Sequence, residues 1–249
     1  WSKSVRSNAS ACFAYLVRRH VRQIHVSFRH FRLRMDIIGP VFRVGAPAIV
    51  VQSLSTFMSL GLNKIFGLYS ETYVAVLGAY FKLQNFIYMV VYGLGNAVVP
   101  MIAFNCGAHS RARVAGIIRS AMAAAIVSML AGMVLLLAVP GPLLGLFNLD
   151  SEALAIGIPA MRIVSLSFAA AGVSLVCSYT FQATGSNSAS LVLALLRQIV
   201  ILLPLAAVLL HTDPALTWWA FPIAEGVCLI LALLLFRSAY RKRIAPLGA

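Results

Sequence analysis

Six long apolar runs, separated by short polar connectors, make up most of the chain after its first forty residues. The runs cover residues 44–67, 73–105, 113–139, 154–184, 188–210 and 215–237. A helix of about 20 apolar residues is long enough to cross the hydrocarbon core of a bilayer. Because the connectors are short, successive spans must run in opposite directions. The pattern predicts an all-α integral membrane protein with six antiparallel transmembrane helices.

The composition agrees with a membrane protein and excludes an ordinary soluble domain. Hydrophobic residues make up 61% of the chain, charged residues only 10%, and the mean hydropathy is +0.92. The net charge of +14 would favour nucleic acid as a partner in a soluble chain, but here the basic clusters flank the apolar runs. Their expected partner is therefore anionic membrane lipid, and nucleic acid is not expected.

The distribution of charge also predicts the topology, because cytoplasmic connectors carry an excess of Lys and Arg. Arg111 and Arg113 fall on the same side as both basic ends of the chain, so both termini should be cytoplasmic. We expect residues 1–43 to form a basic cytoplasmic juxtamembrane linker or a segment lying on the membrane surface, and residues 238–249 a basic cytoplasmic tail. Four of the six acidic residues lie on the opposite side: Glu71, Asp150, Glu152 and Asp213.

Polar side chains recur at helical spacing within the first two spans. In the second span, steps of three and four residues place five side chains on one helical face: Lys82, Asn85, Met89, Tyr92 and Asn96. In the first span, a similar stripe contains Gln52, Ser55, Thr56, Ser59 and Asn63. Polar groups at this depth normally face protein or a water-filled path. Interhelical hydrogen bonds would explain the hydroxyls, whereas the larger amides are equally well explained as cavity-lining residues.

Four charged side chains inside the spans need separate explanations. Lys82 and Glu225 both lie about 15 Å from the outer ends of their spans, from the rise per residue of a helix. They could form a pair and respond to ions or protons, although separate neutral partners are the more expected arrangement. Arg162 is near enough to an outer edge to reach the headgroups. Arg197 is expected to be a structural anchor that reaches the cytoplasmic interface or a group of carbonyls.

The sequence carries no motif for catalysis. A phosphate-binding loop of the form GxxxxGK[ST], a G-x-S-x-G nucleophile elbow and a His/Cys metal spacing are all missing from it. The four cysteines are scattered along the chain. We therefore expect neither an enzyme nor a bound metal or cofactor.

Several motifs in order resemble the second half of a multidrug and toxic compound extrusion (MATE) transporter. They are GAPAIVVQ (45–52), AYFKLQNF (79–86), GLGNAVVPMIAFNCGA (93–108), FQATG (181–185) and LLRQIVILLP (195–204). The resemblance covers nearly the whole chain after residue 34 and is closest to the MepA-type branch. It implies one six-helix lobe, residues 44–237, of a twelve-helix transporter, so that the chain would be a fragment.

The resemblance implies a cation-coupled antiporter of the bacterial cytoplasmic membrane, which exports bulky, often cationic drugs by alternating access in exchange for H+ or Na+. The two polar stripes would then face the cleft between this lobe and a missing N-terminal six-helix lobe. Tyr88, Met89 and Tyr92 would contact a cationic drug, while Lys82 and Asn85 would set polarity or respond to protonation. Family carboxylates expected in the first and fourth spans do not occur here, so Glu225 is the one acid within the spans.

Two alternatives remain open at this stage. A flippase for lipid-linked substrates, from the same superfamily, would favour a more basic cleft that holds phosphate groups. A non-transporting membrane scaffold would use the polar stripes for assembly alone. The chain opens on Trp1, which leaves open whether it is a truncated piece or a half-transporter that needs a partner.

Overall fold

The computed structural model describes residues 35–248, and the side chains at positions 36–38, 40–48, 51 and 52 are outside the description. The chain forms two compact units, residues 1–45 and 46–249. Most of the predicted linker at residues 1–43 lies outside the described residues, so the linker remains a prediction. Apart from the first residues of α2, the description below concerns the second unit.

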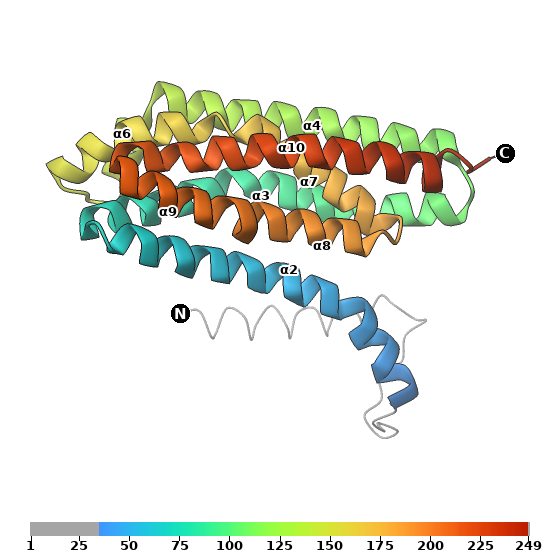
Figure 1. The fold of residues 1–249 in the computed structure, drawn as a ribbon. Coiled ribbons are helices and arrows are strands. Elements are labelled where there is room, and N and C mark those ends of the chain that lie inside the picture. The colour runs from blue at the N-terminus through green and yellow to red at the C-terminus, as the bar shows by residue number, and fades with distance from the viewer. Residues whose placement is uncertain (1–34, 249) are drawn as a thin grey trace, which may run out of the picture. The chain divides into compact units, whose positions relative to one another are not determined.

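Helices account for nearly all the described residues, and no strand occurs among them, which confirms the all-α prediction (Figure 1). In chain order they are α2 (Met35–Gly67), α3 (Glu71–Gly107), α4 (Arg111–Ala138), α5 (Pro140–Gly145), α6 (Ser151–Ser165), α7 (Phe168–Ala183), α8 (Asn187–Leu195), the π-helix η2 (Leu196–Ile201), α9 (Leu202–Thr212), the 3-10 helix η3 (Pro214–Trp219), α10 (Ala220–Ala239) and the π-helix η4 (Tyr240–Ile244).

The predicted number of spans is only partly reproduced. Within the described residues, four helical stretches are long and apolar enough to cross a membrane: 71–107, 111–138, 187–212 and 214–244. Helices α6 and α7 count as a fifth span if the pair, bent by 48°, is taken together. The first predicted span, 44–67, lies in α2, which this count does not include.

Polar side chains in two of the connectors cap the α-helices that follow them, α3 and α6. Ser70 Oγ accepts a hydrogen bond from Thr72 N, at 3.1 Å, at the start of α3. Asp150 accepts one from Ala153 N, at 2.8 Å, at the start of α6. Such caps satisfy backbone donors that have no partner within the helix, which is why these helices begin at the polar connectors.

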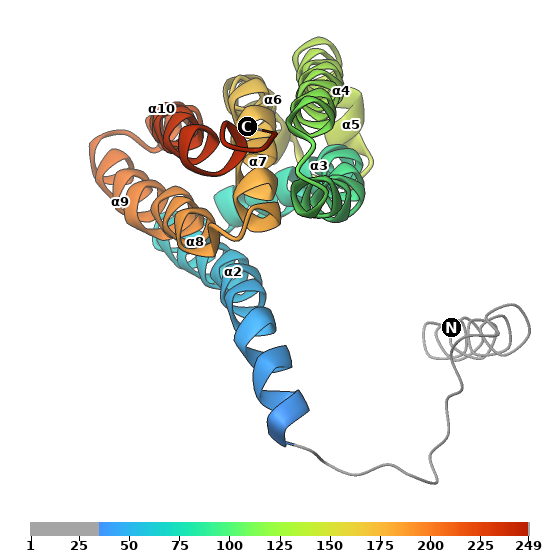
Figure 2. The ribbon, with the colours of Figure 1, turned by 90° about the vertical axis from the view of Figure 1, so that its right-hand side faces the viewer.

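Helix α7 lies at the centre of the bundle, where it packs against α3, α4 and α10 (Figures 1 and 2). At one end, the buried Trp218 of η3 packs on Phe66 of α2, with ring centres 4.9 Å apart, and on Tyr73 of α3, at 6.3 Å. Large apolar side chains also cover the outside, and Phe86 and Phe104 are each 74% exposed. Lipid tails are as apolar as these side chains, so they suit a surface that faces hydrocarbon.

Two glycines allow close helix contacts that a larger residue would block. A Cβ atom at Gly95 of α3 would collide with the ring of Tyr179 in α7. A Cβ atom at Gly132 of α4 would collide with Ile87 of α3. Small residues serve the same purpose throughout membrane bundles, because they let backbones approach each other.

Candidate functional site

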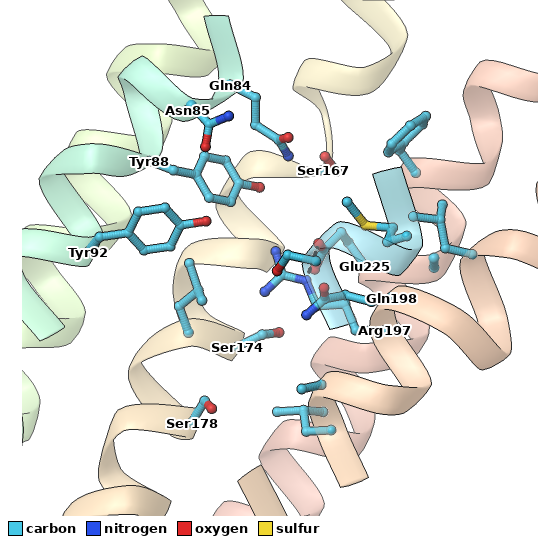
Figure 3. Close-up of a pocket in the computed structure, with 18 of the residues that line it drawn as sticks. Gln84, Asn85, Tyr88, Tyr92, Ser167, Ser174, Ser178, Arg197, Gln198 and Glu225 are labelled. Carbon is cyan, nitrogen blue, oxygen red and sulfur yellow. Dashed lines mark hydrogen bonds and ion pairs between the residues drawn. The ribbon is translucent and has the colours of Figure 1, made fainter. Parts of the chain in front are cut away.

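A cavity of about 470 Å³ lies between α3, α7, η2 and α10 (Figure 3). Its walls are mixed: phenol, amide and hydroxyl groups alternate with apolar side chains, and Ser55, Met58 and Ser59 of α2 complete one side. Of the described residues that line it, Arg197 and Glu225 are the two with charged side chains. A cavity of this size and chemistry is in the usual range for small-molecule sites.

The α3 wall is formed by Gln84, Asn85, Tyr88 and Tyr92, which are at successive turns of one helix. The rings of Tyr88 and Tyr92 meet edge to face, with centres 6.0 Å apart. Tyr88 is buried, whereas Tyr92 is 45% exposed. Figure 3 shows both phenol hydroxyls directed toward the cavity. This wall therefore offers aromatic edges and faces, together with groups that can form hydrogen bonds.

The position of the α7 wall depends on an interruption of the helix between α6 and α7. Helix α6 ends at Ser165 and α7 begins at Phe168, and the Ser167 hydroxyl donates to the Val164 carbonyl at 2.6 Å. On the C-terminal side of this interruption, Ser174 and Ser178 face the cavity (Figure 3). Ser178 shares a hydrogen bond of 2.7 Å with Ser190 of α8. The bend thus sets the direction in which α7 presents its hydroxyls.

An ion pair crosses the cavity from η2 to α10. Arg197 Nε donates to Glu225 Oε1 at 2.6 Å, and the two side chains are only 17% and 10% exposed. A buried charge is costly unless it is paired, so each residue stabilises the other's presence at this depth. The pair also connects two elements that are 28 residues apart in sequence.

Arg197 is presented by an irregular turn of helix. It lies in the π-helix Leu196–Ile201, seven residues before Pro204, which is in the first turn of α9. Proline has no N–H and its ring collides with the carbonyl four residues earlier, here Val200. The wider turn relieves this conflict and places both Arg197 and Gln198 on the cavity. Such π-turns occur often at functional sites.

The predicted stripe on α3 is exposed along its whole length, at Lys82, Asn85, Met89, Tyr92 and Asn96. Asn85 and Tyr92 also line the cavity, as do the predicted Tyr88 and Ser59. Lys82, Met89, Asn96 and Asn63 do not line it. Gln52 lies outside the described side chains.

Glu225 and Lys82 are not partners. Glu225 is paired with Arg197, and Lys82 Nζ instead lies 5.4 Å from the centre of the Phe147 ring, in the turn after α5. The expectation that Arg197 reaches an interface or carbonyls is likewise wrong, since its hydrogen bond goes to a carboxylate. Two residues at equal depth in different helices are not necessarily neighbours. Helix α10 packs against η2, and this contact brings Arg197 to Glu225.

The sequence contained a signal for the true pair. Arg197 stands 14 residues before His211 and Glu225 stands 11 residues after Pro214, on either side of one short connector. Two opposite charges at similar distances from a tight connector are expected to meet. Gln84, Ser174 and Gln198 had no comparable signal. Within residues 35–248, no three His, Cys, Asp or Glu side chains are grouped so as to hold a metal ion.

A family model named MatE matches residues 47–208. The chain belongs to the MatE family. Members of this family are transporters and not enzymes, which confirms both the family resemblance and the expectation of a non-enzymatic membrane protein. The matched residues include most of the cavity, but not the part of α10 that carries Glu225.

Relatives of this MatE protein include multidrug export proteins of staphylococci. The chain is 28% identical over 229 residues to the multidrug export protein MepA of Staphylococcus saprophyticus, covering 91% of this chain and 50% of that protein. It is 23% identical over 231 residues to MepA of Staphylococcus aureus, covering 92% of this chain and 51% of that one. The chain thus spans about half the length of the curated relatives it matches.

Solved structures agree on the fold. The MATE multidrug transporter DinF-BH, in complex with R6G, superposes with a TM-score of 0.79 at 28% identity, covering 96% of this chain and 54% of that one. An outward-facing multidrug resistance MATE family transporter of the MOP superfamily superposes with a TM-score of 0.83 at 20% identity, covering 96% and 53%. The protein is therefore a multi-pass membrane protein of MATE architecture.

Proposed function

We propose that this chain acts as the C-terminal half of a multidrug efflux antiporter, which exports bulky, often cationic compounds by alternating access. The observation that carries the proposal is the cavity of about 470 Å³, which is lined by tyrosines, amides and hydroxyls inside membrane-spanning helices. Aromatic rings bind organic cations and flat ring systems, and scattered polar groups orient them. The staphylococcal relatives, each about twice as long, are named multidrug export proteins.

The exposed α3 stripe supports a cleft beside this cavity. Polar side chains that face hydrocarbon are costly, so an exposed stripe through the middle of a membrane helix suits contact with water or another protein surface. We propose that the stripe forms one wall of a cleft, and that the opposite wall comes from a second six-helix lobe. Lys82, Asn85, Met89, Tyr92 and Asn96 would then meet the transported compound, together with Gln52, Ser59, Asn63 and Tyr88.

The coupling ion would be H+ or Na+, with no other cofactor. Glu225 is the acid of the described cavity, but its charge is already matched by Arg197. We therefore place the main ion-coupling carboxylate outside this lobe, and leave Glu225 and Lys82 as groups that respond to ions or protons. The expected location is the bacterial plasma membrane, with both ends of this chain cytoplasmic.

The test compares matched asparagines on one helix. Asn85 Nδ2 donates to the Phe81 carbonyl at 2.9 Å, and Asn105 Nδ2 donates to the Met101 carbonyl at 2.8 Å, but only Asn85 lines the cavity. In the complete gene product, Asn85→Leu should lower export of fluorescent dyes from cells about tenfold, while Asn105→Leu should leave it nearly unchanged. Membrane abundance, measured by immunoblot, should be equal in both variants.

The alternatives predict different results. Export that survives combined replacement of Gln52, Asn85 and Asn96 by leucine would remove the claim that they contact substrate. Intact assembly with loss of export would remove the scaffold hypothesis. The flippase hypothesis has less support from the cavity, because Arg197 is its one described cation and is paired with Glu225.

A further inference from the structure

The guanidinium of Arg197 has one edge occupied and one edge available. Its Nε donates to Glu225 Oε1, and no described residue accepts a hydrogen bond from its two Nη atoms. The side chain is 17% exposed, and that exposure is to the cavity that it lines. Figure 3 shows the guanidinium between Glu225 and the tyrosines of α3. A group entering the cavity would therefore meet guanidinium N–H donors.

Glu225 is less accessible than Arg197. Its side chain is 10% exposed, and its second oxygen, Oε2, is buried without a partner among the described residues. The pair is neutral as a whole, but the part of it that faces the cavity is the positive part. The carboxylate holds Arg197 in place, and the arginine is the member that a ligand can reach.

The charge balance of the cavity indicates which ligand suits it. Arg197 and Glu225 cancel, and the remaining described lining residues are uncharged. A simple anion could bind the guanidinium but would leave a net charge in a poorly solvated site, which is costly. A simple cation could lie against the tyrosines but would leave the open edge of the guanidinium without an acceptor. A zwitterion adds no net charge, and its carboxylate can take that open edge, whose planar fork matches the two carboxylate oxygens.

We propose that the Nη edge of Arg197 is a docking point for the carboxylate of a zwitterionic aromatic compound, whose ring system lies against Tyr88 and Tyr92. The assignment rests on the proposed export function, which it refines by naming a class of substrate. The competing explanation is that Arg197 only holds η2 against α10. That role would make every ligand respond alike to its replacement.

Two dyes that share one ring system separate these explanations. Rhodamine 110 is a zwitterion with a free carboxylate, and rhodamine 123 is its methyl ester and a cation. We would measure binding of each dye to the complete purified protein in lipid nanodiscs by fluorescence polarisation. Arg197→Lys keeps the charge but loses the fork, so it should weaken binding of rhodamine 110 at least about tenfold and that of rhodamine 123 less than about twofold.

Two further variants test whether misfolding explains a loss of binding. Replacing Arg197 and Glu225 together by glutamine keeps the site neutral, and this double variant should show the same selective loss of rhodamine 110. Arg162→Lys is the matched control, because Arg162 is exposed in α6 and does not line the cavity, and both dyes should bind to it as to the wild type.

The outcomes separate the inference from the function on which it rests. Wild-type protein that binds neither dye, or equal weakening of both dyes in the Arg197 variants, overturns the docking role. If wild-type cells export neither dye while the selective binding loss is found, the export proposal fails and the carboxylate site stands.

Discussion

The region around Lys82 and the region around Arg197 each place one basic side chain inside a membrane-spanning helix, yet their surroundings are opposite. Lys82 is exposed on α3, and its Nζ reaches over the ring of Phe147 at the end of the bundle. Arg197 is enclosed on η2 and is held by Glu225 at 2.6 Å. A long flexible amine can extend along its own helix toward a better solvated end, whereas a guanidinium in the interior must find a partner where it stands.

This difference shows that depth along a span does not by itself tell what a charged residue does. Both residues lie well inside their helices, so counting residues from the helix ends does not distinguish them. The deciding quantity is what the neighbouring helices present at the same level. Around Arg197 they present a carboxylate and a cavity, and around Lys82 they present an aromatic ring and open surface.

The largest effect should come from removing one half of the buried pair. Glu225→Ala leaves the Arg197 charge without its partner, which should lower the free energy of unfolding by about 3–5 kcal/mol. Thermal unfolding of the purified protein in detergent measures this. Replacing both residues by glutamine should cost clearly less, because no charge is stranded. A double variant as unstable as the single one would contradict the explanation by pairing.

A smaller effect is expected from packing beside the cavity. Gly95→Ala would push a methyl group into the ring of Tyr179, a lining residue, and should cost about 1–3 kcal/mol. Gly93→Ala is the matched control, since nothing lies within 4 Å of its added Cβ atom and alanine favours the helix by about 1 kcal/mol. The melting temperatures of the two variants should shift in opposite directions. Equal shifts would mean that the α3–α7 contact is looser than described.

The smallest effect on stability belongs to Lys82. Lys82→Ala removes only an exposed cation and its contact with Phe147, so the loss should stay within about 1 kcal/mol. We expect export by the complete protein, or the pH dependence of that export, to change more than membrane abundance does. Transport assays at several external pH values, alongside an immunoblot of membranes, measure both quantities. Equal losses of export and abundance would make Lys82 a structural residue.

The apolar runs and the polar connectors between them predicted the bounds of two long helices to within two residues. The predicted span 73–105 is α3, residues 71–107, and the predicted span 113–139 is α4, residues 111–138. A polar connector precedes each of these helices, and Ser70 also caps the start of α3. Both signals are local. The break between α6 and α7 and the π-turn at residues 196–201 were not predicted, because both lie within continuous apolar runs where a regular helix is the default.

The sequence alone determined the class of protein, the family and the polar face of α3, because these depend on composition and on side-chain spacing within single helices. Only the tertiary structure decided which of those polar groups border the cavity and which acid neutralises Arg197. The physical reason is that pairing a buried charge depends on distances between helices. Those distances are set by packing contacts, such as Gly95 against Tyr179, and by the irregular turns that direct each side chain.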